Sequence, residues 1–398
     1  VEGAARVSDY NLGNTGTVWA YNAGLIWAPV KDLRFRASYQ KSVRAPSLGD
    51  LYTNPTQTFN NVFDDPCAQQ NINKNPNRVR NCTAAGVPTT QTFEVGGVTT
   101  TEPFSNRPTS GVAAANSGNP GLQAERGTSY TIGAVFQPRF VPGLSVSVDY
   151  YNIEIKDVIF TLHPQLVLEQ CYDNPSGIDN PFCAAVNRLP NGTFAGQRTV
   201  FHAGGATVTL NNPGFSSLGR PFNYARQKTS GIDVDVNYRA GLGGDTTLNL
   251  RGIASYLINR DNYTDISQPN FINQQKFELG DPEWRFQGTA NLETGRFNFQ
   301  YRMQYIGKQI LNGFQYETFF GLQGRPPLDP DATPFAFYPE TFYHDIRLEI
   351  KATDKVDFYM GVDNLFDTRP PYDLLGIEAG SSYDPTGRFF YAGFKAKF

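Results

Sequence analysis

The residue types that catalyse reactions or bind metals are few and scattered along this chain. The three histidines, His163, His202 and His344, form no cluster, and this favours histidines in solvent or in a lumen over metal ligands. No G-x-S-x-G, H-E-x-x-H, P-loop or C-x-x-C motif occurs. His344 is next to Asp345 in a predicted strand, but no Ser is near it in sequence. The sequence therefore predicts no enzymatic activity, no metal site and no cofactor.

The four cysteines fall into two local pairs, and each pair lies in a polar segment rich in Asn and Pro. Cys67 pairs by proximity with Cys82, and Cys171 with Cys183. Two loop-closing disulfides in an oxidising compartment are the interpretation we favour over four free thiols. Tyr172 and Phe182 flank the second pair and are expected to pack the loop around its disulfide.

Aromatic side chains in a long loop are the candidates for ligand binding, because they offer contact area beside polar groups that orient a ligand. The alternative is that they pack loops together or lie at a membrane interface. The candidates are Phe314, Tyr316, Phe319 and Phe320.

These residues must be held by β-strands, because apolar and polar residues alternate with a period of two through most of the chain. In residues 297–305 one face is Phe, Phe, Tyr, Met and Tyr, and the other is Asn, Gln, Arg and Gln. Residues 284–293 alternate in the same way, and Thr294-Gly295 joins the two runs as a tight hairpin. Similar runs occupy residues 232–238, 248–256, 346–351, 356–363 and 390–398.

The connections between the predicted strands alternate between short and long. Short turns are expected near residues 29–32, 138–143, 241–244, 294–295 and 353–355, and long loops at about 45–126, 157–222, 260–282, 309–342 and 366–387. A transmembrane barrel has this asymmetry, with short periplasmic turns and long outer loops. A soluble β-sandwich also alternates its faces but seldom has such loops.

The composition agrees with a barrel that crosses a membrane by strands. Aromatic residues make up 14% of the chain, and no run of about eighteen apolar residues could form a transmembrane helix. A net charge of −3 gives no basic excess for binding nucleic acid. In such a barrel the apolar face meets outer-membrane lipid, and the polar face lines the lumen. The charged lumen candidates are Asp233, Asp235, Arg251, Arg285, Arg302, Arg347 and Glu349.

Residues 144–156 alternate less regularly than the other runs. Leu144, Val146 and Val148 share one face, whereas Ile153 and Ile155 fall on the other. A β-bulge near Tyr150-Tyr151 would restore the phase and is expected there. The pattern predicts about twelve antiparallel strands over residues 1–398 as one domain.

Five segments resemble conserved boxes of the TonB-dependent outer-membrane receptors, in that family's order and across nearly the whole chain. Residues 43–52 resemble its FRAPSLxELY box, with Val43 in place of Phe. Residues 119–125 resemble its NPxLxPE box, with Ala124 in place of Pro. Ser230–Asp233 resembles its "GxE" strand start, and Asn364–Asp367 resembles its NLFD box. Gly387–Phe398 resembles its last strand, which ends on an aromatic residue.

The resemblance implies an all-β, antiparallel transmembrane β-barrel of twenty-two strands with an N-terminal plug in its lumen. Residues 1–398 would hold roughly the last twelve strands, and the plug, the TonB-contacting box and the first strands would lie outside this chain. The implied function is TonB-dependent active transport of a scarce nutrient across the outer membrane of a Gram-negative bacterium. The implied partners are TonB, the plug and a small-molecule or oligosaccharide ligand, and the charged lumen residues would hold the plug.

Three other functions stay open from the sequence. A passive porin-like channel would need no plug, an outer-membrane enzyme would need a catalytic set on the strands, and a soluble lectin would need no membrane. Residues 47–118 contain no His, which counts against a haem receptor. Ferric siderophore, cobalamin and oligosaccharide ligands fit the loops equally well.

Overall fold

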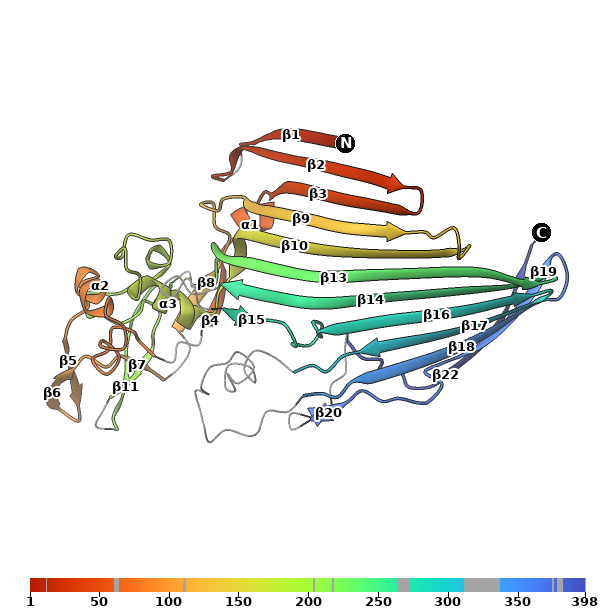
Figure 1. Cartoon of the computed structure of the whole chain (residues 1–398). Coiled ribbons are helices and arrows are strands. Elements are labelled where there is room, and N and C mark those ends of the chain that lie inside the picture. Colours follow the sequence, from red (N-terminus) through yellow and green to blue (C-terminus); the bar gives the residue numbers. More distant parts are fainter. Residues whose placement is uncertain are drawn as a thin grey trace.

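The computed structural model of the chain is dominated by one large antiparallel sheet (Figure 1). It describes residues 1–397 apart from residues 12, 61–63, 110–111, 203–204, 217, 264–271, 311–336, 374–375 and 378–381. Twelve strands follow one another along a single path, and the short strand β15 (Asn273–Gln274) pairs with β14 at its edge. The path runs through β1 (Glu2–Tyr10), β2 (Gly16–Val30), β3 (Leu33–Arg44), β9 (Glu125–Phe136), β10 (Leu144–Thr161), β13 (Pro221–Gly243), β14 (Thr246–Tyr263), β16 (Trp284–Thr294), β17 (Phe297–Ile306), β18 (Thr341–Lys351), β19 (Val356–Asp363) and β22 (Phe389–Ala396).

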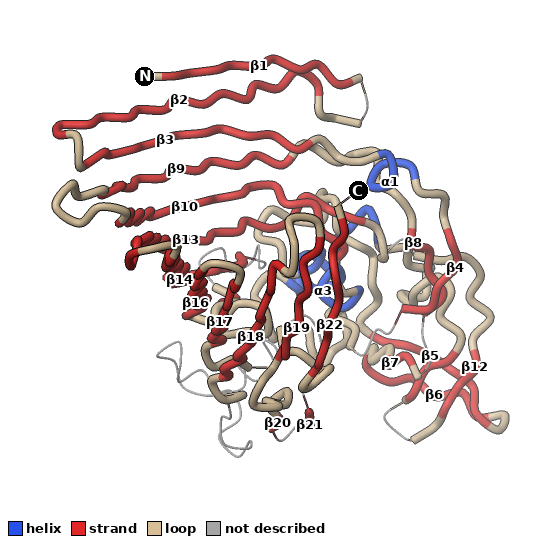
Figure 2. Tube along the Cα trace, turned by 90° about the vertical axis from the view of Figure 1, so that its right-hand side faces the viewer, coloured by secondary structure: helices blue, strands red, loops and turns tan. Residues whose placement is uncertain are grey.

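The sheet curves strongly toward its C-terminal strands but stays open (Figure 2). Its two edges are β1 and β22, which are not paired with each other in the described residues. The prediction of an all-β antiparallel fold is therefore confirmed, and a closed barrel is not formed by these strands alone.

The connections differ at the two ends of the sheet (Figure 1). Short turns of a few residues, such as 244–245 between β13 and β14 and 295–296 between β16 and β17, lie at one end. Gly295 has a φ of 54° in the second of these turns. The long connections all lie at the other end. No helix in the described residues is long and apolar enough to cross a membrane.

The expected bulge near Tyr150-Tyr151 is wrong. The register of β10 with β9 and β13 runs without a break through both tyrosines, and the shifts flank Val158. Asp157, beside it, has a φ of 58°. β10 runs on to Thr161, beyond the expected end at residue 156, and Ile155 packs against a hydrophobic cluster formed by the loops and the ends of β10 and β13. Ile153 and Ile155 therefore do not need to share the face of Val148.

The two longest connections, residues 45–124 and 162–220, fold into one unit that we call the loop domain. It contains the helices α1 (Leu48–Tyr52), α2 (Arg78–Ala84), α3 (Pro164–Tyr172) and the 3₁₀ turn η1 (Cys183–Ala185). Its short strands form three small sheets: β4 (Thr56–Asn60) with β8 (Val112–Asn116), β5 (Thr90–Val95) with β6 (Val98–Pro103), and β7 (Arg107–Pro108) with β11 (Thr199–Phe201) and β12 (Thr207–Thr209). A further hairpin, β20 (Tyr372–Asp373) with β21 (Gly376–Ile377), lies in the connection from β19 to β22.

Candidate functional site

The register of the sheet places the predicted charged residues on a single face, which we call the polar face. Directly paired residues of neighbouring strands point to the same side. Asp149 pairs with Asp233, which pairs with Ser255, which pairs with Arg285. The other candidates follow by the same pairing or by steps of two along a strand. All seven lie on this face: Asp233, Asp235, Arg251, Arg285, Arg302, Arg347 and Glu349.

In two ion pairs on the polar face, the arginine side chain stays about half exposed to solvent. Arg251 contacts Asp235 at 2.9 Å, and the side chain of Arg251 is 57% exposed. Arg302 contacts Asp345 at 2.6 Å, and Arg302 is 49% exposed. Exposed pairs of this kind contribute at most about 1 kcal/mol to stability. Their charges therefore remain available to another polar surface.

Arg36 and Asp149 join the same face, and sequence reasoning missed both. The guanidinium of Arg36 on β3 reaches over β9 to the carboxylate of Asp149 on β10, with Nε 2.6 Å from Oδ1. Gly133 lies between them, and a Cβ there would come within 2.7 Å of Cγ of Asp149. The alternation of Phe35 with Arg36 would have placed Arg36 on this face.

Two of the sequence boxes dock against each other where the sheet meets the loop domain. Ser47 caps α1, with Asp50 completing a capping box. The backbone N–H of Asn119 donates to the carbonyl of Asp50 at 2.8 Å. Gly118 is required here, because a Cβ would lie 2.5 Å from the carbonyl carbon and oxygen of Leu51.

An ion pair completes this junction and ties it to the end of β10. Nε of Arg44 donates to Oε2 of Glu125 at 2.8 Å. The other carboxylate oxygen of Glu125 accepts from the backbone N–H of Ile159 at 2.8 Å, just past the bulge. The first two boxes therefore anchor the loop domain to β3, β9 and β10.

The box at 364–367 forms a tight turn at the start of the last long connection. Asn364 has a φ of 52° and is buried. Its side chain donates to the carbonyl of Thr368 and accepts from its N–H, both at 2.8 Å. Oδ1 of Asp345, on β18, accepts from the backbone N–H of Asn364 at 2.8 Å. The box thus fixes where the chain leaves β19.

A buried ion pair joins the two halves of the loop domain. Asp65 lies in the first connection and Arg188 in the second, and their side chains are 0% and 7% exposed. Both carboxylate oxygens of Asp65 accept from Arg188, at 2.6 and 2.7 Å. Arg188 also donates to the hydroxyl of Tyr172 at 2.6 Å. Burial alone would lower the pKa of Arg188, but the Asp65 carboxylate outweighs this and raises it.

A second buried pair repeats this arrangement beside α2. The guanidinium of Arg78 contacts both carboxylate oxygens of Asp173, at 2.6 and 2.9 Å. The side chain of Asn81 donates to the backbone carbonyls of Tyr172 and Asn174, each at 2.8 Å. The first long connection is therefore fastened to the second by charged and amide groups in several places.

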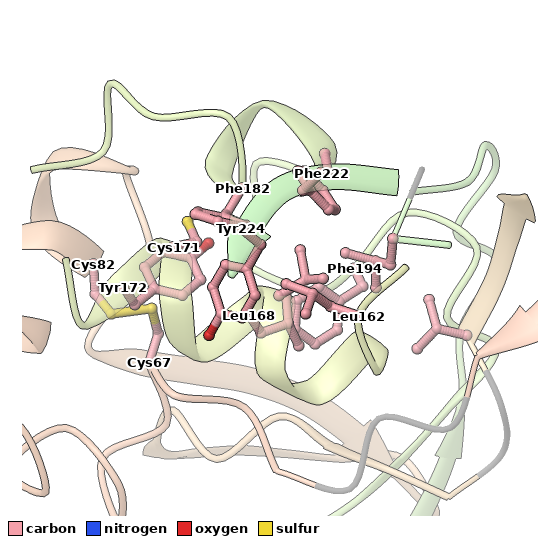
Figure 3. Packing of buried hydrophobic residues seen from close by; sticks show 14 of the residues in the cluster. Cys67, Cys82, Leu162, Leu168, Cys171, Tyr172, Phe182, Phe194, Phe222 and Tyr224 are labelled. Carbon is pink, nitrogen blue, oxygen red and sulfur yellow. A yellow bond between two sulfur atoms is a disulfide. The ribbon is translucent and has the colours of Figure 1, made fainter. Parts of the chain in front are cut away.

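The predicted disulfides are both present. Cys67 is bonded to Cys82, and Cys171 to Cys183. Tyr172 and Phe182 are buried in the same hydrophobic cluster, as expected. Figure 3 shows this cluster, with α3 packed beside the end of β13, where Phe222 and Tyr224 contact Phe182.

The remaining candidates do not form a site in the described structure. Phe314, Tyr316, Phe319 and Phe320 lie outside the described residues. The three histidines have different partners, and His202 is buried, contrary to the expectation for it. His163 caps α3, His202 contacts Glu102 at 2.8 Å, and His344 contacts the hydroxyl of Tyr301 at 2.6 Å. No group of three His, Cys, Asp or Glu side chains in the described part of the chain could hold a metal ion.

Comparison with known proteins gives a family and a fold. The family model described as "TonB dependent receptor-like, beta-barrel" matches residues 1–365. No curated protein sequence matches the chain. Among solved structures, the siderophore receptor PirA from Acinetobacter baumannii has a TM-score of 0.57 and 15% identity, and the match covers 99% of this chain and 43% of PirA.

A second similar structure is a variant of the ferric enterobactin receptor PfeA from Pseudomonas aeruginosa, in complex with enterobactin. Its TM-score is 0.56 at 14% identity, and the match covers 100% of this chain and 43% of that receptor. At these identities the likeness shows the fold alone. The chain spans less than half the length of both receptors.

Proposed function

Because the chain belongs to the TonB-dependent receptor β-barrel family, we propose that it forms part of the wall of an outer-membrane transporter for a scarce nutrient. The function would be active uptake driven through TonB, not catalysis. The protein would be embedded in the outer membrane of a Gram-negative bacterium as a multi-pass β-barrel.

The observation that carries this proposal is the separation of the two sheet faces. The polar face holds charged residues along successive strands, whereas the opposite face is aliphatic and aromatic except at the strand ends beside the long connections. On the apolar face, Tyr21 contacts Tyr39, Tyr130 contacts Tyr150, and Phe358 contacts Phe394. A transmembrane barrel needs such a face toward lipid and a polar face toward its interior.

Closure of the barrel would require partners for the free edges of β1 and β22, since lipid cannot satisfy backbone hydrogen bonds. In the proposed protein, further strands complete a barrel of twenty-two, and a plug domain fills its lumen. The solvent-exposed pairs of Arg251 and Arg302 would meet the plug by polar contacts. Such contacts can break and re-form without exposing apolar surface to water.

The loop domain would lie on the outer side, where the long connections gather. Its disulfides and buried ion pairs would give the ligand a rigid surface at the barrel mouth. Rigid binding surfaces lose less conformational entropy when they bind a ligand. The ligand would then pass along the polar face when TonB displaces the plug.

Ferric siderophores are the substrate class to test first, because the similar solved structures are siderophore and ferric enterobactin receptors. Cobalamin and oligosaccharides are the next classes. A passive porin-like channel is the alternative function, and it would work without TonB.

The direct test is uptake by cells that express the full-length protein containing this chain. Radioactive iron bound to a panel of siderophores would be supplied to matched strains with and without TonB. We expect at least one siderophore to enter only when TonB is present, and entry to stop after a proton uncoupler. Equal entry with and without TonB would support the passive channel instead. If no siderophore enters, the same paired strains would be tested with cobalamin and oligosaccharides.

A further inference from the structure

Basic side chains gather on the apolar side of the sheet, at the end where the long connections begin. The strand register places them on the face of Tyr39 and Tyr130. Lys41 pairs with Thr128, Arg126 pairs with Lys156, and Lys228 pairs with both Glu154 and Asp261. We call this set the basic patch, and it consists of Lys41, Arg126, Lys156, Arg226 and Lys228.

The patch lies on four neighbouring strands, β3, β9, β10 and β13, which follow one another in the sheet (Figure 1). The segments that carry it are far apart in sequence, from residue 41 to residue 228, so no single basic run produces it. The matching ends of β16, β17 and β18 carry aromatic residues on the same face, namely Trp284, Tyr305 and Phe342. At these three positions the face therefore carries aromatic rings in place of cations.

The charges of the patch are mostly not neutralised within the protein. In the described residues, Lys41, Arg126, Lys156 and Lys228 take part in no ion pair, and Arg226 has one long contact of 3.8 Å with Glu154. Lys41, Arg126 and Lys156 are exposed. The nearby acidic residues are Glu154, Asp261 and Asp157 of the bulge. Positive charge is thus in excess.

Two cations of the patch lie over aromatic rings. Lys41 lies over the ring of Tyr21 at 5.8 Å, and Arg226 over the ring of Tyr263 at 3.8 Å. Next along the same face toward the short turns come Tyr39, Tyr130 and Tyr150, followed by aliphatic residues. The order is aliphatic, tyrosine and then cation, which follows the order of acyl chain, interface and headgroup in a membrane.

We propose that the basic patch is a docking site for the phosphate groups of an anionic lipid in the outer leaflet. The acyl chains of this lipid would lie on the aliphatic band of β9, β10 and β13. Lys and Arg bind phosphate oxygens by charge-assisted hydrogen bonds. The site faces away from the polar face, so it is separate from the proposed transport path. It rests on the proposed function only through the orientation of the apolar face toward lipid.

The test uses the full-length protein reconstituted in phosphatidylcholine nanodiscs that contain a minor fraction of lipid A, a phosphorylated glycolipid. Native mass spectrometry would measure lipid A bound per protein. We expect Arg126→Glu with Lys156→Glu to weaken the apparent affinity for lipid A by about tenfold or more. Arg126→Gln with Lys156→Gln should weaken it less, and this pair keeps the proposal testable if the first variant does not fold.

The matched control is Lys31→Glu with Lys355→Glu, which makes the same change of net charge in two short turns at the opposite end of the sheet. This control should keep the affinity of the unchanged protein. Unchanged affinity in both patch variants, an equal loss in the control, or displacement of lipid A by inorganic phosphate at similar concentration would each overturn the proposal. Failure of the unchanged protein to enter pure phosphatidylcholine nanodiscs would overturn the proposed membrane orientation as well. Normal entry with unchanged lipid A affinity would overturn only the lipid site.

Discussion

At the scale of the residue, burial distinguishes an ion pair inside the loop domain from one in the short turns of the sheet. The pair of Asp65 and Arg188 is almost fully buried, and it joins two connections through residues that are 123 positions apart in sequence. By contrast, the pair of Arg139 and Asp32 lies in the short turns, and Arg139 is 72% exposed. A buried charge that loses its partner is far more costly than an exposed one.

Arg188→Ala should therefore lower the free energy of unfolding of the loop domain by about 3–5 kcal/mol, because it leaves the buried Asp65 carboxylate without its partner. Hydrogen exchange of α3, followed by mass spectrometry on the full-length protein, measures this loss. Arg139→Ala is the control and should cost less than about 1 kcal/mol. Similar exchange rates in the two variants would show that the buried pair does not hold the connections together.

At the scale of the residue, local chemistry was predictable where partners are close in sequence. The pairs Cys67–Cys82 and Cys171–Cys183 lie within single connections and were predicted correctly. The contacts of Asp65 with Arg188 were not predicted, because the local sequence pattern does not indicate which loops contact each other. The same limit applies to Arg44 and Glu125, which lie in separate boxes and meet only through the sheet.

At the scale of the element, the strands owe their faces to the period of two. Away from the long connections, each strand carries its charges on the side that its neighbours also make polar, so ion pairs form directly between neighbouring strands. Arg251 on β14 meets Asp235 on β13, and Arg302 on β17 meets Asp345 on β18. In the proposed transporter, these pairs would contact the plug.

Reversing two of these charges tests contact with the proposed plug. Arg251→Glu with Arg302→Glu places like charges beside Asp235 and Asp345 and should loosen the plug. We expect cells with the full-length variant to admit more of a large antibiotic, measured by the minimal inhibitory concentration. Arg251→Lys with Arg302→Lys keeps the charges and is the control. If leakage stays the same while the reversed variant assembles at normal levels, these arginines do not hold a plug.

The alternation predicted most strands, because it is local and repeated. It failed at β10, where Ile153 and Ile155 suggested a bulge near Tyr150-Tyr151. A prediction from periodicity assumes that each face of a strand keeps one environment along its whole length. The end of β10 instead packs into the hydrophobic cluster of the loop domain. The true register shifts flank Val158, and only tertiary packing explains them.

At the scale of the whole molecule, the chain combines an open curved sheet with a loop domain at one end (Figures 1 and 2). The order of the five sequence boxes predicted the family, which the match over residues 1–365 confirms. The merging of residues 45–124 and 162–220 into one domain was not predicted. Alternation describes single strands, whereas this domain depends on contacts between distant connections.

The central claim is that one face of the sheet meets lipid and the other lines the transport path. Adjacent positions in the middle of β16 test it most directly. Ala290 lies on the apolar face between Leu250 and Tyr301, and Asn291 lies on the polar face, where it donates to Glu293 at 3.1 Å. An arginine at these two positions would differ only in the face it occupies.

The measurement is the amount of folded full-length protein in the outer membrane, read from heat-modifiable gel mobility. Ala290→Arg puts a charge into lipid and should cost roughly 2–4 kcal/mol, so folded protein should fall sharply. Asn291→Arg enters a polar space beside Glu293 and should assemble normally. Equal assembly of the two variants, or the reverse order, would contradict the assignment of the faces.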